Sequence, residues 1–226
     1  MTASGATADN SGPACVVLLH GLARTAASME EMEEALAEAG FRVANIDYPS
    51  RDHPIEELAD LAIEDGLFLC GEPGSGGKVH FVTHSLGGIL VRYYFENNDS
   101  SVVGRVVMLG PPNQGSVAAD KMADWPGFDW LNGPAGLQLG KGPESIPLRL
   151  GTPGFEFAVI AGNRTIDPIT SAVLDDPDDG KVSVDDTRLD GMADFRVMPV
   201  SHAYIMKDDD VIDLVIRFLQ TGAFDW

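Results

Sequence analysis

The chain has 226 residues, of which 44% are hydrophobic and 22% charged, and 35 acidic residues against 15 Lys and Arg give it a formal net charge of −20. The length and composition fit a compact globular protein. The acidity and the lack of a sustained basic run argue against binding to nucleic acid or to an anionic membrane through phosphate contacts. Acidity of this degree is also compatible with adaptation to high salt, where screening removes the self-repulsion.

The termini and the cysteines carry few signals. Residues 1–13 lack both a basic residue and an apolar core, so we predict a flexible tail and no signal peptide. No apolar stretch approaches the ~18 residues of a membrane span, so we expect no stable membrane insertion and favour a cytoplasmic location. Cys15 and Cys70 show neither metal-site nor disulfide-framework spacing. We expect two separate buried side chains, with a bond between them as the less favoured alternative.

Apolar runs and helical patterns alternate along the first half of the chain. Residues 15–21 form a continuous apolar run ending in Gly, which predicts a strand buried on both faces. Residues 28–40 follow with helical spacing and a glycine stop, and residues 41–49 alternate like a strand that Pro49 ends. A helix is predicted over residues 54–69, with Pro54 at its first position.

The second half repeats this alternation around an irregular stretch. Strands are predicted at 78–84, 102–112, 155–163 and 194–202, and helices at 86–98 and 208–222. A Gly- and Pro-rich insertion at about 111–154 breaks the pattern. Alternating strands and helices imply right-handed crossovers. We therefore predict an α/β fold, a single domain over residues 14–226 with a doubly wound, mostly parallel sheet flanked by helices and a minimal cap.

The sequence FVTHSLGG, residues 81–88, places Ser85 between a predicted strand and a predicted helix. A Gly-x-Ser-x-Gly turn raises a nucleophilic serine above the end of a sheet, and it needs small residues on either side. Gly87 meets this need, while Thr83 stands in place of the first glycine and fits more tightly. The alternative is that Ser85 only caps the helix that it precedes.

The sequence LLHGL, residues 18–22, could supply an oxyanion site. A backbone N–H in the loop after the first strand can donate to a developing oxyanion. We assign this role to the amides of Leu22 and of Leu86, the residue after the proposed nucleophile. His20 is expected to be a structural hydrogen-bonding residue.

A serine needs a base to take its proton. Of the five histidines, His53 lies in a polar turn, His80 lies inside a strand pattern, and His84 is expected to point to the other side of the turn from Ser85. His202 remains, in the loop before the last predicted helix, and is our candidate base. The alternative is a surface histidine in a loop.

The acid that orients this base is sought in the carboxylate-rich segment 175–191. Asp179 is the best candidate, because Gly180 permits a tight turn after it and Val182 can anchor the loop in the core. The reserves are Asp178, Asp176 and, more distantly, Asp167. The resulting order of serine, acid and histidine is the one found on strand–turn–helix serine hydrolases.

Several segments, HFVTHSLGGILVRYY, GRVVMLGPPNQGS, GPAGLQLG, DDGKVSV and VMPVSHAYIM, make the chain resemble the α/β-hydrolase superfamily. Within it, the resemblance is to small bacterial lipases and esterases that lack a large cap. On this pattern Ser85, Asp179 and His202 match the catalytic triad, and Leu22 and Leu86 match the oxyanion amides. The resemblance implies ester hydrolysis without a metal or cofactor.

Together these features predict a serine carboxylic-ester hydrolase that acts through an acyl-enzyme on soluble short-to-medium acyl esters. The aromatic side chains of Trp125, Phe128 and Trp130 are candidates for the acyl pocket, or they pack the insertion onto the core. The alternatives are a thioesterase or acyltransferase with the same triad, and a non-catalytic ligand-binding protein on this fold. The oligomeric state is left open.

Overall fold

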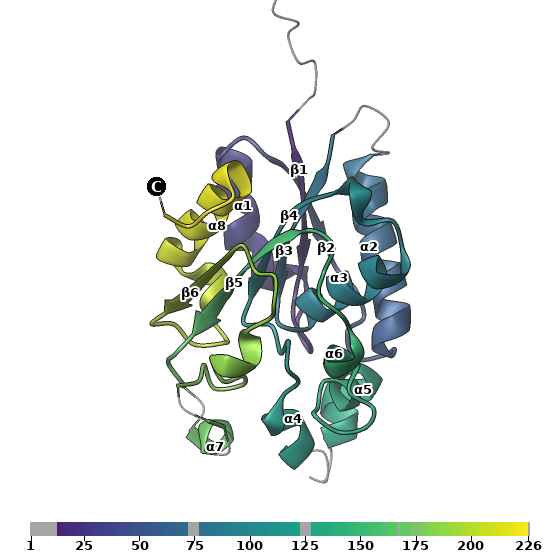
Figure 1. Cartoon of the computed structure of the whole chain (residues 1–226), viewed down its shortest axis with the longest axis vertical. Coiled ribbons are helices and arrows are strands. Elements are labelled where there is room, and N and C mark those ends of the chain that lie inside the picture. Colours follow the sequence, from purple (N-terminus) through teal and green to yellow (C-terminus); the bar gives the residue numbers. More distant parts are fainter. Residues whose placement is uncertain are drawn as a thin grey trace, which may run out of the picture.

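The computed structural model describes residues 13–71, 77–122, 128–166, 168–172, 174–175 and 177–225. A parallel sheet runs through this part of the chain in the strand order β2-β1-β3-β4-β5-β6 (Figure 1). Its strands are β1 (Cys15–Leu19), β2 (Arg42–Ile46), β3 (Val79–His84), β4 (Val103–Leu109), β5 (Glu156–Gly162) and β6 (Asp194–Met198). The predicted α/β architecture is confirmed.

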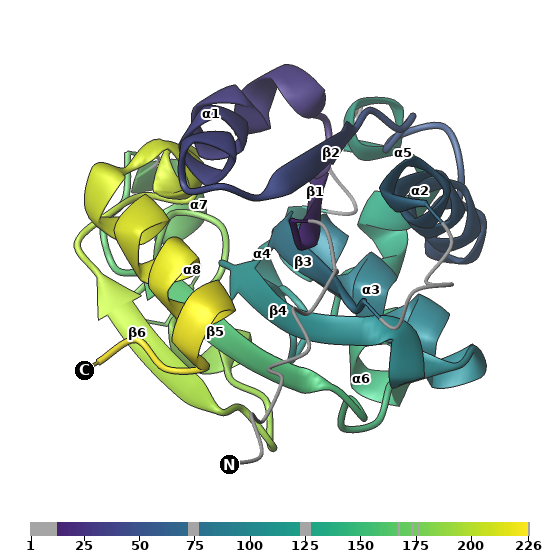
Figure 2. The ribbon, with the colours of Figure 1, turned by 90° about the horizontal axis from the view of Figure 1, so that it is seen from above.

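Helices cover both faces of the sheet (Figure 2). One face carries α1 (Glu30–Glu38) and α8 (Asp209–Thr221), and the other carries α2 (Ile55–Cys70) and α3 (Leu86–Asn97). Along β1, Val16 and Leu18 pack into one apolar cluster and Val17 and Leu19 into the other. This burial on both faces accounts for the unbroken apolar run in the sequence. In the described part of the chain no helix is both long enough and apolar enough to cross a membrane.

The element boundaries differ from the predicted ones mainly at helix starts. The first helix begins with a 3₁₀ turn, η1 (Ala26–Met29). Pro54 is the residue that precedes α2 and not its first member, because its ψ of 164° keeps it extended. Three further 3₁₀ turns lie near the later elements: η2 (Ser100–Val102), η3 (Asp185–Thr187) and η4 (Ile205–Lys207).

The segment at 111–154, predicted to be irregular, contains short helices in its described part. These are α4 (Val117–Met122), α5 (Phe128–Gln138) and α6 (Ile146–Arg149), and α7 (Pro168–Ser171) follows β5. The chain kinks within α5 at Gly133, where φ is 64° just before Pro134. All four helices lie beyond the carboxyl ends of the strands, at the bottom of Figure 1.

The strand order reverses at β1, which lies between β2 and β3. The chain leaves β1 toward α1 on one face of the sheet and leaves β3 toward α3 on the other face (Figure 2). Such a reversal opens a crevice at the carboxyl ends of the strands, where α/β proteins bind their ligands. The segment before Leu22 and the segment before Ser85 both end at this crevice.

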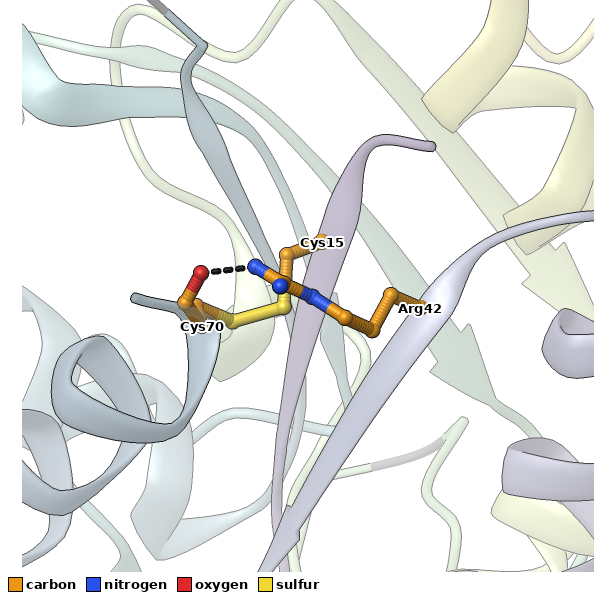
Figure 3. Close-up of a disulfide and its surroundings, with 3 residues drawn as sticks. All are labelled: Cys15, Arg42 and Cys70. Carbon is orange, nitrogen blue, oxygen red and sulfur yellow. Dashed lines mark hydrogen bonds between the residues drawn. A yellow bond between two sulfur atoms is a disulfide. The ribbon is translucent and has the colours of Figure 1, made fainter. Parts of the chain in front are cut away.

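Cys15 and Cys70 form a disulfide, so the prediction of two separate cysteines is wrong. The bond is possible because α2 packs closely on β1. A Cβ added at Gly66 would lie 2.6 Å from a methyl of Val17, and this close approach brings the last residue of α2 over the first of β1. Figure 3 shows the Arg42 side chain passing beside the disulfide and donating to the carbonyl oxygen of Cys70. A cation at this carboxyl end of α2 is favourable to the helix dipole.

We predict that the double variant Cys15→Ser with Cys70→Ser loses about 3–4 kcal/mol of unfolding free energy, because the bond restricts the unfolded chain. The two cysteines are 55 residues apart in sequence, which makes this restriction large. Urea denaturation without reductant measures the loss. A reductant should destabilise the wild type by a similar amount and leave the double variant unchanged. A wild type that keeps its stability after the bond is opened would contradict this account.

Candidate active site

Ser85 lies in a strained turn between β3 and α3, with φ of 51° and ψ of −115°. A residue with a side chain is rarely found in this conformation, which costs of order 1–3 kcal/mol. The Ser85 hydroxyl makes no capping bond to α3. It lies instead 3.0 Å from Nε2 of His202. The alternative in which this serine only caps a helix is therefore wrong.

Glycines make the sharp turn possible. A Cβ added at Gly87 would lie 2.8 Å from the carbonyl oxygen of Leu19, so α3 begins in direct contact with the end of β1. Thr83 is fully buried. It fits because Gly88 faces it: a Cβ there would lie 3.3 Å from the Thr83 hydroxyl. The space that the first glycine of the motif usually gives is supplied here by Gly88.

His202 and Asp179 complete a continuous row of hydrogen bonds with Ser85. Nδ1 of His202 lies 2.7 Å from Oδ2 of Asp179. The second carboxylate oxygen of Asp179 accepts from the backbone N–H groups of Lys181, at 2.9 Å, and Val182, at 2.8 Å. The His202 N–H also donates to the Asp179 carbonyl at 2.9 Å. The acid and the imidazole are thus held together through both side chain and backbone.

The neighbouring carboxylate of Asp178 makes different contacts. It accepts from the hydroxyl of Ser171 at 2.7 Å and from the N–H of Gly180 at 2.7 Å. These contacts shape the loop and leave only Asp179 in contact with the imidazole. The other two reserves, Asp176 and Asp167, lie outside the described residues.

His84, predicted to point to the other side of the turn from Ser85, lies beside His202. Its ring centroid lies 4.7 Å from that of His202, and its Nε2–H donates to the His202 carbonyl at 3.0 Å. Because side chains alternate along a strand, His84 shares a face with Val82, toward the loop that enters α8. Burial, and then the nearby His202, lower the pKa of His84 well below its usual value. His84 is therefore neutral at physiological pH and supports the backbone of His202.

His20 has the structural role that was predicted. Its ring stacks on Tyr48, with centroids 4.0 Å apart, and Nδ1 donates to the carbonyl of Gly21 at 2.9 Å. The Tyr48 hydroxyl donates to the backbone carbonyl of His20. These contacts fix the start of the loop after β1.

The amides of Leu22 and Leu86, the predicted oxyanion donors, lie in the loop after β1 and at the start of α3. Leu86 is the first residue of α3, where an N–H has no partner within the helix. Leu22 lies in the loop after β1, and Ser50 holds this loop by accepting from the N–H of Ala23 at 3.1 Å. Within the described part of the chain neither Leu22 nor Leu86 donates its N–H to another protein group. Both amides are thus available to a bound group.

A pocket of about 230 Å³ opens beside the serine. Ala118 and Ala119 of α4 and Gly136 of α5 form part of its described wall, and the sequence pattern did not single them out. The described lining consists of Leu22, Arg24, His84, Ser85, Pro112, Ser116, Ala118, Ala119, Gly136, Leu139, Lys181, Val182 and His202.

The role of the three aromatic side chains in this pocket stays a prediction. Trp125 lies outside the described residues, and only the backbone of Phe128 and Trp130, in α5, is described. Among the residues that the structure does describe, no three or more His, Cys, Asp and Glu side chains are grouped so that they could hold a metal ion.

Comparisons of structure find lipases among the similar folds. The mature lipase BlEst2 of Bacillus licheniformis has 22% identity over 93% of each chain and a TM-score of 0.69. The phospholipase PlaB of Legionella pneumophila has 19% identity over 94% of this chain and 60% of its own, with a TM-score of 0.73. Lipase B of Aspergillus fumigatus has 19% identity over 92% of this chain and 52% of its own, with a TM-score of 0.63. At these identities the likeness concerns the fold alone.

Comparisons of sequence identify the family. No curated protein matches the chain. The sequence model described as "Alpha/beta hydrolase family" matches residues 16–224, which include the strained serine, the acid and the histidine of the site. Because this match covers nearly the whole chain, the protein belongs to the alpha/beta hydrolase family.

Proposed function

We propose that the protein is a serine ester hydrolase that works through an acyl-enzyme. The observation that carries this proposal is the row of hydrogen bonds from the Ser85 hydroxyl through His202 to Asp179. A serine in this arrangement is activated by its base, and the carboxylate orients the base. A non-catalytic binding protein would not need the row or the strained turn that presents the serine.

In the first half of the reaction, Nε2 of His202 takes the hydroxyl proton as Ser85 Oγ attacks the ester carbonyl carbon. The carbonyl oxygen becomes an oxyanion that accepts from the N–H groups of Leu22 and Leu86, an interaction worth about 3–4 kcal/mol for a single donor. Asp179 keeps the proton on Nδ1 of His202 and stabilises the imidazolium. Collapse of the intermediate expels the alcohol, which takes the proton from Nε2.

The second half releases the acid. His202 removes a proton from water, and the resulting hydroxide attacks the acyl-enzyme carbonyl. A second oxyanion forms on the same amides and collapses to free Ser85 Oγ, which recovers its proton from His202. Ester and water are thus converted to acid and alcohol, and each half uses the same side chains.

The pocket supports small substrates. At about 230 Å³ it is smaller than the ~300–1,000 Å³ of pockets that hold drug-sized ligands. Its described lining is mostly apolar, as an acyl chain needs. The net charge of −20 would repel an anionic lipid surface. We therefore propose soluble esters of short-to-medium acyl chains as substrates, in contrast to the lipids named for some of the similar structures.

The first prediction of this mechanism is that Ser85→Ala lowers kcat/KM for 4-nitrophenyl butyrate by at least about 10⁴-fold, because the nucleophile is lost. Absorbance of released nitrophenolate measures the rate. Ser145→Ala is the matched control: that serine is also buried, but its hydroxyl caps α6. The control should keep its rate, and hydrolysis by Ser85→Ala at the wild-type rate would refute the proposed nucleophile.

Gly110 makes room for the acid and the base. It follows β4 with φ of 55°, and its N–H donates to the carbonyl of Ile160 in the next strand at 2.9 Å. A Cβ at this position would lie 3.0 Å from Oδ2 of Asp179 and 3.1 Å from Nδ1 of His202. A larger residue would therefore push apart the two groups that share the proton.

We accordingly predict that Gly110→Ala lowers kcat by about 10- to 100-fold, since small misplacements of catalytic groups have effects of this size. Gly40→Ala is the control, because Gly40 also has a positive φ, of 93°, but nothing lies within 4 Å of an added Cβ. In both variants the alanine adopts a positive φ, which lowers the unfolding free energy by a similar amount of about 1–2 kcal/mol. Ester kinetics and thermal unfolding separate the two effects, and equal kcat values for both variants would be evidence against this role of Gly110.

A further inference from the structure

The charged side chains in the described lining of the active-site pocket differ in sign from the net charge of the protein. The chain has 35 acidic residues against 15 Lys and Arg. The charged side chains in the described lining of the pocket, other than its histidines, are those of Arg24 and Lys181, and both are basic. Two basic side chains therefore line the pocket of a protein whose formal net charge is −20.

Arg24 lies two residues after Leu22 in the loop that follows β1. Its Nη2 donates to the carbonyl of Ala203, the residue after His202, at 3.3 Å. This contact holds the guanidinium against the backbone of the residue that follows His202. The side chain is half-buried, and burial lowers the pKa of Arg24 from its usual value.

The guanidinium of Arg24 has no carboxylate within ion-pair distance in the described part of the chain. By comparison, Arg196 pairs with Asp225, and the buried Arg92 donates to several backbone carbonyls, among them those of Asn113 and Leu150. A desolvated cation without a counter-charge is unfavourable. A guanidinium also offers a planar fork of donors that fits carboxylate and phosphate oxygens.

Lys181 lines the same pocket from the acid-bearing loop. Its backbone N–H donates to Asp179, which fixes its position next to the triad. Its Nζ lies 3.3 Å from the hydroxyl of Thr170. Basic side chains from the loop after β1 and from the acid loop therefore line one pocket.

We propose that Arg24 binds an anionic group of the substrate, so that the preferred esters carry a carboxylate or a phosphate close to the ester bond. This inference rests on the proposed ester hydrolysis and narrows its substrate class. Both kinds of anionic group present oxygens that accept hydrogen bonds from the planar guanidinium of Arg24. They could belong to the free carboxylate of a diacid monoester or to the phosphate of a glycerol phosphate ester.

Two matched pairs of esters test the proposal and distinguish these sources. The first pair is mono-4-nitrophenyl glutarate and 4-nitrophenyl pentanoate, which have equal acyl chain lengths and differ by a terminal carboxylate. The second pair is 1-butyrylglycerol 3-phosphate and 1-butyrylglycerol. The quantity compared is the ratio of kcat/KM for the anionic ester to that for the neutral ester, with active enzyme counted by titration with a fluorophosphonate.

We expect Arg24→Gln to lower this ratio about tenfold or more in at least one pair, because a charge-assisted hydrogen bond is lost. The pair in which the ratio falls identifies the source of the anion. Arg24→Lys should retain part of the preference, since it keeps the charge but loses the fork. Arg196→Gln, which removes the same charge from a residue outside the pocket lining, should give the wild-type ratio.

Two results would overturn the inference, and they are distinguishable. If neutral esters are hydrolysed through Ser85 but Arg24→Gln keeps the wild-type ratio in both pairs, the anion site is wrong and the ester hydrolase proposal stands. If none of the four esters is hydrolysed in a way that depends on Ser85, the proposed function fails together with the anion site.

Discussion

The carboxylate of Asp179 fixes the imidazole of His202, and the rest of the site depends on this contact. Asp179 is almost fully buried, and two backbone amides hold its second oxygen. The neighbouring strand ends are shaped around it: a Cβ at Gly162 would lie 2.9 Å from the Cβ of Asp179. Because Nδ1 of His202 is held by this carboxylate, Nε2 is the ring nitrogen that is left to contact Ser85. The base is therefore pre-organised before a substrate arrives.

The sheet brings the parts of the site together. The proposed nucleophile follows β3 and one proposed oxyanion amide follows β1. The proposed acid lies in the segment between β5 and β6, and the proposed base follows β6. Because all these strands are parallel, their following loops meet at one edge. The strain at Ser85 is borne by this framework, since α3 starts in direct contact with the end of β1. Groups that are held by strands and helices are positioned more precisely than groups on loops alone.

Patterns local in sequence made much of this predictable. Buried strands are continuous apolar runs, and the turn at Ser85 combines a strand, a small-residue motif and a helix within eight residues. The order of serine, acid and histidine then limited the choice of partners. In the sequence, the main reason to prefer Asp179 over Asp178 is that Asp179 directly precedes a glycine. In the structure the two differ in their hydrogen-bond partners, because Asp179 contacts His202 and Asp178 accepts from Gly180.

Features that depend on packing between distant segments were not predictable. The disulfide needs α2 to lie on β1, which no property of the two isolated cysteines indicates. Disulfide bonds are typical of oxidising compartments and rare in the cytoplasm. The bond therefore does not support the predicted cytoplasmic location, which stays a prediction. The contact between His84 and the His202 carbonyl, across 118 residues of sequence, depends in the same way on the packing of the end of β3 against the loop after β6. Arg24 was missed because an arginine in a loop carries no local signal.

The central claim is that Ser85 is a nucleophile activated by His202, and covalent labelling tests it most directly. The protein is treated with a fluorophosphonate, digested and mapped by mass spectrometry. The account predicts one phosphonyl adduct, on the peptide that contains Ser85, formed rapidly by the wild type and far more slowly by His202→Ala. An unmodified Ser85 peptide, or labelling at the same rate without His202, would contradict it.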